Sequence, residues 1–138
     1  MDRLKLRTLL ILEEGFKLKP YVDTVGKLTV GVGRNLTDRG ISEETALQML
    51  EEDLDVVQAD MATFPWWAGL DVVRQTVLAD MRFNLGPARF RAFKNTLKAV
   101  AEGRYADAAA GMLASKWAKQ VKGRATKLAK MMETGTDA

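Results

Sequence analysis

Residues 13–33 read EEGFKLKPYVDTVGKLTVGVG, and within this stretch the chain changes from a helical to a strand-like pattern. Asp2 is placed to cap a helix that ends with the two glutamates, and Gly15 can close it in a left-handed conformation. From Tyr21 to Val32 the hydrophobic period becomes two, and Gly26 supplies a turn. These features predict an N-terminal helix followed by a short antiparallel hairpin or small sheet.

Alternation along the second strand assigns its side chains to two faces. Leu28, Val30 and Val32 form an apolar face, which we expect to pack inward. The opposite face is small and polar, and we expect it to line a cleft; it carries Thr29, Gly31 and Gly33.

The chain after residue 42 has helical periodicity throughout. Ser42 is a candidate cap for a long helix that ends near Phe64 and Pro65. Further helices are predicted at roughly 70–85, 89–101, 105–115 and 119–132. The expected fold is therefore α+β and mostly α. It is one domain over 1–138, with a small β lobe at about 16–38 and a helical lobe formed by residues at about 42–138 together with the first helix. We expect a cleft between the two lobes.

Composition limits the available chemistry. The 138 residues are 47% hydrophobic and include neither cysteine nor histidine. Disulfides, thiol nucleophiles, the usual zinc sites and Ser-His-Asp catalysis are therefore excluded or improbable. We expect no metal and no cofactor, so that catalysis rests on carboxylates, hydroxyls, amides or cations.

Charge is distributed unevenly along the chain. Residues 1–87 contain 10 Lys and Arg against 14 Asp and Glu, whereas residues 88–138 contain 11 against 4. A basic C-terminal half is compatible with a polyanionic partner, but it is equally typical of a solvated surface without one. No nucleic-acid-binding motif accompanies it, so we expect no nucleic-acid partner. Separately, we expect the protein to be a monomer.

The N-terminal segment fits neither a signal peptide nor a membrane span, because the apolar run Leu9–Leu12 is interrupted by Glu13 and Glu14. We expect synthesis in the cytoplasm and no stable insertion into a membrane. A substrate outside the membrane would then require a separate route of release.

Two carboxylates and a hydroxyl are brought together by one helix end and one hairpin. Glycoside hydrolysis needs one carboxyl to protonate the leaving oxygen and one carboxylate to activate water. A glutamate in the last turn faces the negative end of the helix dipole, which favours the protonated form. Spacing does not separate Glu13 from Glu14 for this role. Asp23 is expected to stay ionised as the base, and Thr29 can hold a water.

The stretch from Glu14 to Gly33 resembles the catalytic signature of the T-even bacteriophage lysozyme family, in the form EGxxLKxYxDTxGxxTxGxG. The resemblance implies a lysozyme-like fold and hydrolysis, with inversion, of the bond between N-acetylmuramic acid and N-acetylglucosamine in peptidoglycan. It implies bacterial lysis for the release of phage progeny. It also selects Glu14 as the acid and assigns Asp23 and Thr29 to the other catalytic positions.

Looser resemblance extends through the helical half to Thr134-Gly135-Thr136. Arg124 corresponds to a family arginine near the catalytic glutamate, and Arg34 stands where the family commonly has histidine. Trp117 lies in an apolar pattern and is expected in the core. The residues that we assign to substrate binding are Leu36, Asn84, Asn95, Thr96 and Arg124.

Two other functions are compatible with parts of the sequence. A binding module could use the basic half to follow phosphate groups. A lytic transglycosylase would cleave the same glycan but would not require a base, so Asp23 and Thr29 argue against it.

Overall fold

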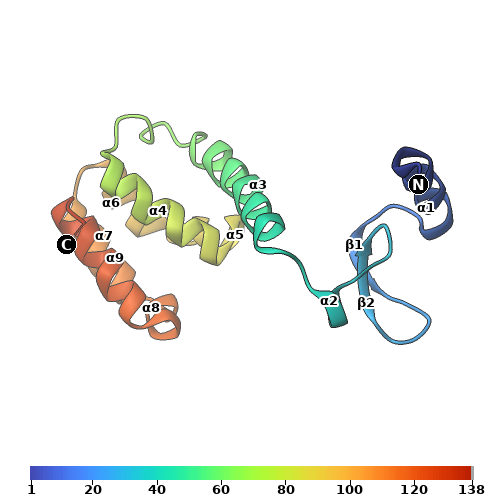
Figure 1. Ribbon diagram of the computed structural model, residues 1–138. Helices are drawn as coiled ribbons and strands as arrows, with labels where there is room; N and C mark the ends of the chain where they lie inside the picture. Colours follow the sequence, from blue (N-terminus) through green and yellow to red (C-terminus); the bar gives the residue numbers. More distant parts are fainter. Residues whose placement is uncertain (138) are drawn as a thin grey trace. The chain divides into compact units, whose positions relative to one another are not determined.

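The computed structural model describes residues 1–137, which form nine helices and three strands (Figure 1). Contacts group the chain into an N-terminal unit, Met1–Met49, and a C-terminal unit, Leu50–Ala138. The N-terminal unit contains the first helix and the sheet, and the assignment of that helix to the helical lobe stays a prediction. The single domain over 1–138 stays a prediction. The predicted class, α+β and mostly α, is confirmed.

The N-terminal unit begins with α1 (Arg3–Glu14), capped as predicted. The Asp2 carboxylate accepts a hydrogen bond from the Lys5 amide over 3.0 Å. Gly15 ends the helix with a φ of 81°, a value that favours glycine, but its ψ of 177° is extended. Gly15 therefore does not form the left-handed cap that we expected. It directs the chain straight into the first strand.

A three-stranded antiparallel sheet follows, in the order β1-β2-β3. Its strands are β1 (Lys17–Val22), β2 (Leu28–Gly31) and β3 (Arg34–Asn35). Tyr21 pairs with Thr29 across the first two strands. The short helix α2 (Leu36–Arg39) comes next, and the Asn35 side chain caps it.

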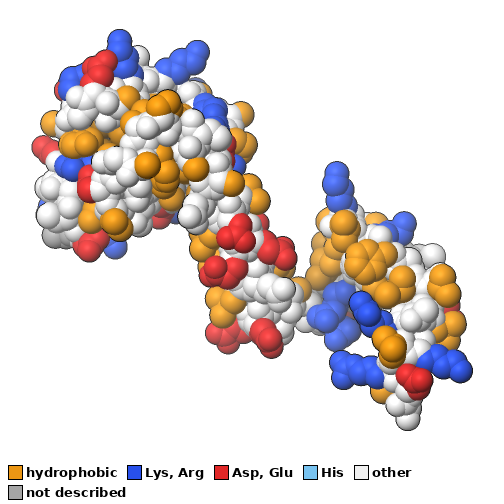
Figure 2. All heavy atoms as spheres, turned by 90° about the horizontal axis from the view of Figure 1, so that it is seen from above, with side chains coloured by type: hydrophobic (Ala, Val, Ile, Leu, Met, Phe, Trp, Pro, Cys, Tyr) orange, Lys and Arg blue, Asp and Glu red, His pale blue; other side chains and the backbone are white. Residues whose placement is uncertain are grey.

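The expected division of β2 into a buried apolar face and an open polar face is wrong. Thr29 is the buried residue of the strand, with 3% of its surface exposed, whereas Leu28 is 43% exposed. A unit of 49 residues has too little interior to enclose all its apolar side chains. Hydrophobic side chains accordingly lie on the surface of this unit in Figure 2.

The C-terminal unit is a group of helices that begins within α3 (Glu43–Met61). The hydroxyl of Ser42 accepts from the Thr45 amide, so the predicted cap is confirmed. Two helices predicted as continuous are each divided, one at Ala92–Phe93 and the other at Lys122, whose φ is 50°. The helices after α3 are α4 (Val72–Leu85), α5 (Pro87–Arg91), α6 (Lys94–Ala101), α7 (Tyr105–Leu113), α8 (Lys116–Val121) and α9 (Gly123–Thr134).

The core of the described residues lies in this unit, where α9 packs against α4, α7 and α8. Long apolar side chains from α3, α4, α5, α7 and α9 fill it. Trp117 is 2% exposed and is a core residue, as predicted. The fully enclosed large side chains are Phe90, Met61, Leu78, Met81, Met112, Met132 and Val77.

Hydrogen bonds from arginine side chains join helices of the C-terminal unit at two places. Asp60 of α3 accepts from Arg82 of α4 over 2.6 Å and from Arg91 over 2.7 Å. Arg74 of α4 donates to the carbonyls of Met132 and Glu133, which lie in the last turn of α9 and lack helical partners. Among residues 1–137, no helix is both long and apolar enough to cross a membrane.

Candidate active site

Glu14 is the last residue of α1 and is exposed. Its carboxyl group lies beside Gly33, in the turn between β2 and β3. A Cβ atom built on Gly33 would lie 3.0 Å from Glu14 Oε2 and 3.1 Å from Cδ. The end of the helix thus presents a carboxyl group against the glycine turn of the sheet.

This contact distinguishes Glu14 from Glu13, which the spacing of apolar residues did not. Both glutamates are exposed and lie in the last turn of α1. The structure brings the Glu14 carboxyl against the turn after β2, the strand that carries Thr29.

Asp23 lies in the turn between β1 and β2, and the turn is built around its side chain. Asp23 Oδ1 accepts from the amide of Val25 over 3.0 Å and from the amide of Lys27 over 2.8 Å. The backbone closes the same turn, because the amide of Gly26 donates to the Asp23 carbonyl over 3.2 Å and Gly26 has a φ of 84°. The carboxylate is therefore held by the loop that it organises.

Thr29 lies opposite Tyr21 in the sheet, and its hydroxyl donates to the Lys27 carbonyl over 2.9 Å. That carbonyl also accepts from the Asp23 amide over 2.9 Å. The structure therefore brings Asp23 and Thr29 together through one residue, Lys27. A hydroxyl whose hydrogen is committed to a carbonyl can still accept a hydrogen bond from water.

Lys27 and Gly33 are the participants that the sequence did not single out for these roles. Lys27 acts through its backbone, which every residue type possesses, so no side-chain pattern marks it. Gly33 belongs to a Gly-x-Gly pair, and its positive φ of 66° is the property that a glycine at this position could signal.

Arg34 and Leu36, the next residues of interest, also lie in the N-terminal unit. The Arg34 guanidinium donates to the Gly40 carbonyl over 3.3 Å, which holds the end of α2. Leu36 begins α2 and is half-buried. Its assignment to substrate binding stays a prediction.

Asn84 and Arg124, two of the predicted substrate-binding residues, have partners within the C-terminal unit. The indole of Trp117 donates to the Asn84 side-chain oxygen over 2.8 Å. Arg124 forms hydrogen bonds of 2.9 and 2.6 Å with Asp80. These contacts link α8 and α9 to α4. The expected pairing of Arg124 with Glu14 stays a prediction.

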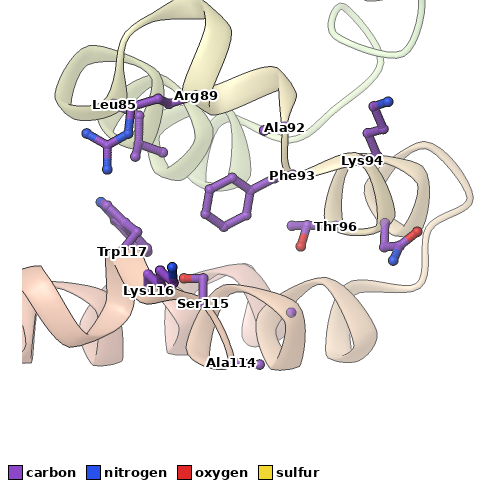
Figure 3. Close-up of a pocket in the computed structure, with 12 residues that line it drawn as sticks. Leu85, Arg89, Ala92, Phe93, Lys94, Thr96, Ala114, Ser115, Lys116 and Trp117 are labelled. Atoms are coloured by element: carbon purple, nitrogen blue, oxygen red, sulfur yellow. The ribbon is translucent and has the colours of Figure 1, made fainter.

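Asn95 and Thr96 line a pocket of about 490 Å³ in the C-terminal unit (Figure 3). Thr96 is buried, and the helix α7 approaches it so closely that a side chain on Gly111 would overlap its hydroxyl. Asn95 is exposed at the start of α6. Phe93 and Trp117 supply aromatic surface to the same pocket. The pocket thus combines aromatic rings with an amide and a hydroxyl, a composition suited to sugars and peptides.

The charged side chains are distributed over the helices as their distribution along the sequence indicates, acidic before residue 88 and basic after it. Acidic side chains gather along α3 (Figure 2), whereas exposed lysines follow α8 and α9. The described residues contain no group of three or more carboxylates that could hold a metal ion.

Comparison with known proteins identifies relatives over nearly the whole chain. The sequence model of the phage lysozyme family matches residues 12–133. Two proteins of Dictyostelium discoideum, the probable T4-type lysozymes 1 and 2, are each 27% identical over 161 aligned positions that cover 95% of both chains. The pre-baseplate central spike protein Gp5 of Enterobacteria phage T4 is 29% identical over 152 positions, which cover 89% of this chain but 26% of Gp5.

Proposed function

Since this chain belongs to the phage lysozyme family, and is thus a glycoside hydrolase that acts on peptidoglycan, we propose that Glu14, Asp23 and Thr29 form its catalytic centre. The bond cleaved is the β-1,4 link from N-acetylmuramic acid to N-acetylglucosamine. The observation that supports this assignment best is the hydrogen-bonded arrangement around Lys27. It connects a carboxylate in the turn between β1 and β2 to a hydroxyl on β2.

In the proposed reaction, the Glu14 carboxyl donates its proton to the glycosidic oxygen as the bond from that oxygen to the anomeric carbon breaks. A water attacks the anomeric carbon from the opposite face and gives a proton to Asp23. Both backbone amides bind Asp23 Oδ1, so Oδ2 is the oxygen that we assign to the water. Thr29 accepts a hydrogen bond from the same water and orients it.

Inversion of configuration is part of this proposal. Inverting glycosidases hold their carboxyl groups roughly 6.5–9.5 Å apart to admit a water, whereas retaining enzymes hold them about 5–5.5 Å apart. Glu14 lies on a helix and Asp23 in a turn beyond β1, so the two groups belong to different elements. We therefore propose that a water lies between them and that Asp23 acts as a base rather than as a nucleophile.

We assign the pocket beside Asn95 and Thr96 to parts of the substrate outside the scissile bond. Peptidoglycan carries acetamido groups and peptide stems, and an exposed amide beside aromatic rings can bind either. Leu36, Asn84 and Arg124 remain proposed contributors to substrate binding.

We also propose that the enzyme is made in the host cytoplasm and reaches the wall through a holin-type membrane lesion, so that lysis releases phage. Expression alone should then leave a bacterial culture turbid, and chloroform should clear it at once. Clearing without a permeabilising agent would contradict this route.

The assignment of Glu14 is tested by a matched pair of variants. Glu14→Gln keeps the shape of the side chain but removes the transferable proton, and we expect the rate of peptidoglycan hydrolysis to fall by about 10²- to 10⁴-fold. Glu13→Gln is the control, because Glu13 lies in the same helical turn, and it should keep most of its activity. Circular dichroism would verify that both variants are folded. The reverse result would show that Glu13 is the acid.

A further inference from the structure

We infer that Gly33 is a positioning residue for the catalytic acid: the absence of a side chain there allows the turn after β2 to lie against Glu14 and fix its carboxyl group. This inference rests on the proposed role of Glu14.

Three distances carry the inference. A Cβ atom on Gly33 would lie 3.0 Å from Glu14 Oε2, 3.1 Å from Cδ and 3.3 Å from Cγ. Ordinary van der Waals contact between carbon atoms begins near 3.5 Å, so a methyl group at position 33 would crowd the Glu14 side chain, whereas glycine leaves the carboxyl group its place. The atoms that an added Cβ would approach most closely belong to the carboxyl end of Glu14, which is the part that we propose transfers the proton.

Glu14 has few other constraints within its own unit. It is exposed, it ends a helix, and the chain leaves that helix through Gly15. A glutamate side chain has three rotatable bonds and loses considerable conformational entropy when it is held in one position. Under our inference the bare turn at Gly33 limits this freedom without adding a competing charge, which suits a group that must be placed against a glycosidic oxygen.

The turn favours glycine at position 33 for a second reason, the positive φ of its backbone. A control at another glycine separates this reason from the space needed beside Glu14. Gly33 has a φ of 66°, a conformation that side chains rarely adopt. Gly40, at the end of α2 in the same unit, has a φ of 59°, but nothing lies within 4 Å of a Cβ built there. Alanine at either position meets a backbone penalty, whereas only alanine at 33 meets Glu14.

Gly33→Ala and Gly40→Ala therefore form a matched pair. At position 33 the flexible end of Glu14 must move by a few tenths of an ångström or more, and a misplaced acid slows the chemical step. We expect kcat of Gly33→Ala to fall by about 10- to 100-fold with KM changed little. Gly40→Ala should lose a similar amount of thermal stability but keep kcat within about twofold of the parent enzyme.

The pH dependence of kcat adds a readout that a purely structural role would not change. The limb of the profile that reports the proton donor should shift in Gly33→Ala and stay in place in Gly40→Ala. Should Gly33→Ala fail to fold, a nuclear Overhauser contact between the α-protons of Gly33 and the γ-protons of Glu14 in the unmodified protein tests the same contact.

The outcomes separate this inference from the proposed function. Full activity of Glu14→Gln would refute the assignment of the acid, whatever Gly33→Ala does. An inactive Glu14→Gln together with equal kcat values for Gly33→Ala and Gly40→Ala would overturn the positioning role alone. A raised KM with unchanged kcat in Gly33→Ala would also overturn it, because the alanine would then obstruct substrate. Absence of the nuclear Overhauser contact would overturn it as well.

Discussion

Asp23 and Lys27 exchange two hydrogen bonds across the turn between β1 and β2. The amide of Asp23 donates to the Lys27 carbonyl over 2.9 Å, and the amide of Lys27 donates to the Asp23 carboxylate over 2.8 Å. Because the same carbonyl accepts from the Thr29 hydroxyl, the positions of the proposed base and of the proposed water-binding group are set by one peptide segment. A change at either side chain therefore also removes hydrogen bonds from the segment that positions the other.

Thr29→Val should separate the role of the hydroxyl from that of the fold. Valine has nearly the shape of threonine but cannot bind water, so we expect turnover to fall by roughly 10- to 100-fold through a misplaced nucleophile. Loss of one hydrogen bond to Lys27 should cost about 1 kcal/mol of stability. Steady-state kinetics and thermal unfolding measure the two effects, and Thr29→Ser, which keeps the hydroxyl, is the control. Equal turnover in Thr29→Val and the parent enzyme would exclude Thr29 from catalysis.

The stereochemistry of the product tests whether Asp23 acts through water. Inversion at a β-linked sugar gives an α-anomeric reducing end as the first product. Proton NMR of a fresh digest, recorded before mutarotation, should show that anomer. An initial β-anomer would instead identify Asp23 as a nucleophile and leave Thr29 without its proposed role.

The lysines of α8 and α9 should affect encounter with the cell wall rather than the chemical step. Lys119, Lys122, Lys127 and Lys130 are all exposed. Added salt screens such charges, so activity on whole cells should fall steeply with ionic strength, whereas hydrolysis of a short neutral oligosaccharide should fall much less. The same salt dependence for both substrates would remove this role for the lysines.

The ion pairs of Asp60 should make the helical unit sensitive to acid. Hydrogen bonds from Arg91 and then Arg82 lower the pKa of Asp60 from 3.8 to about 2. A lowered carboxyl pKa in the folded state contributes stability above the unfolded value, and that stability is lost as the pH falls from about 4 toward 2. The shift corresponds to the order of 2 kcal/mol.

Asp60→Asn provides the test of that contribution. The variant should unfold at a lower temperature than the parent protein at pH 7, and the difference should narrow at pH 2. Calorimetry at both pH values measures it. A difference that stays constant with pH would show that the charge of Asp60 does not stabilise the fold.

Local features of the fold were predictable from sequence wherever a side chain acts on its own backbone. Asp2 and Ser42 cap helices as expected, and the period-two stretch forms strands. The division at Lys122 was not predictable, because its positive φ occurs at a residue type that rarely adopts one. The exposure of Leu28 was missed because alternation gives the two faces of a strand but not which face a small unit can cover.

The side chains of the candidate site stay predictions, whereas the backbone contacts that connect them could not be read from the sequence. Carboxylates and a hydroxyl at this spacing indicate glycoside hydrolysis, and resemblance selected Glu14 over Glu13. The links through Lys27 depend on backbone groups, which carry no sequence signal. The partner of Arg124 within its own unit was also missed, since Asp80 lies 44 residues away along the chain.

The chemical nature of the cleaved ends tests the central claim most directly. In the proposed reaction, Glu14 and Asp23 add one water across the glycosidic bond and leave a reducing N-acetylmuramic acid. Mass spectrometry of peptidoglycan digested by the unmodified protein should therefore show reducing muramic acid ends, and Glu14→Gln should produce almost none. Fragments that end in 1,6-anhydro-muramic acid, lighter by one water, would contradict hydrolysis and show that the sugar's own hydroxyl, rather than a water held by Asp23 and Thr29, completes the reaction.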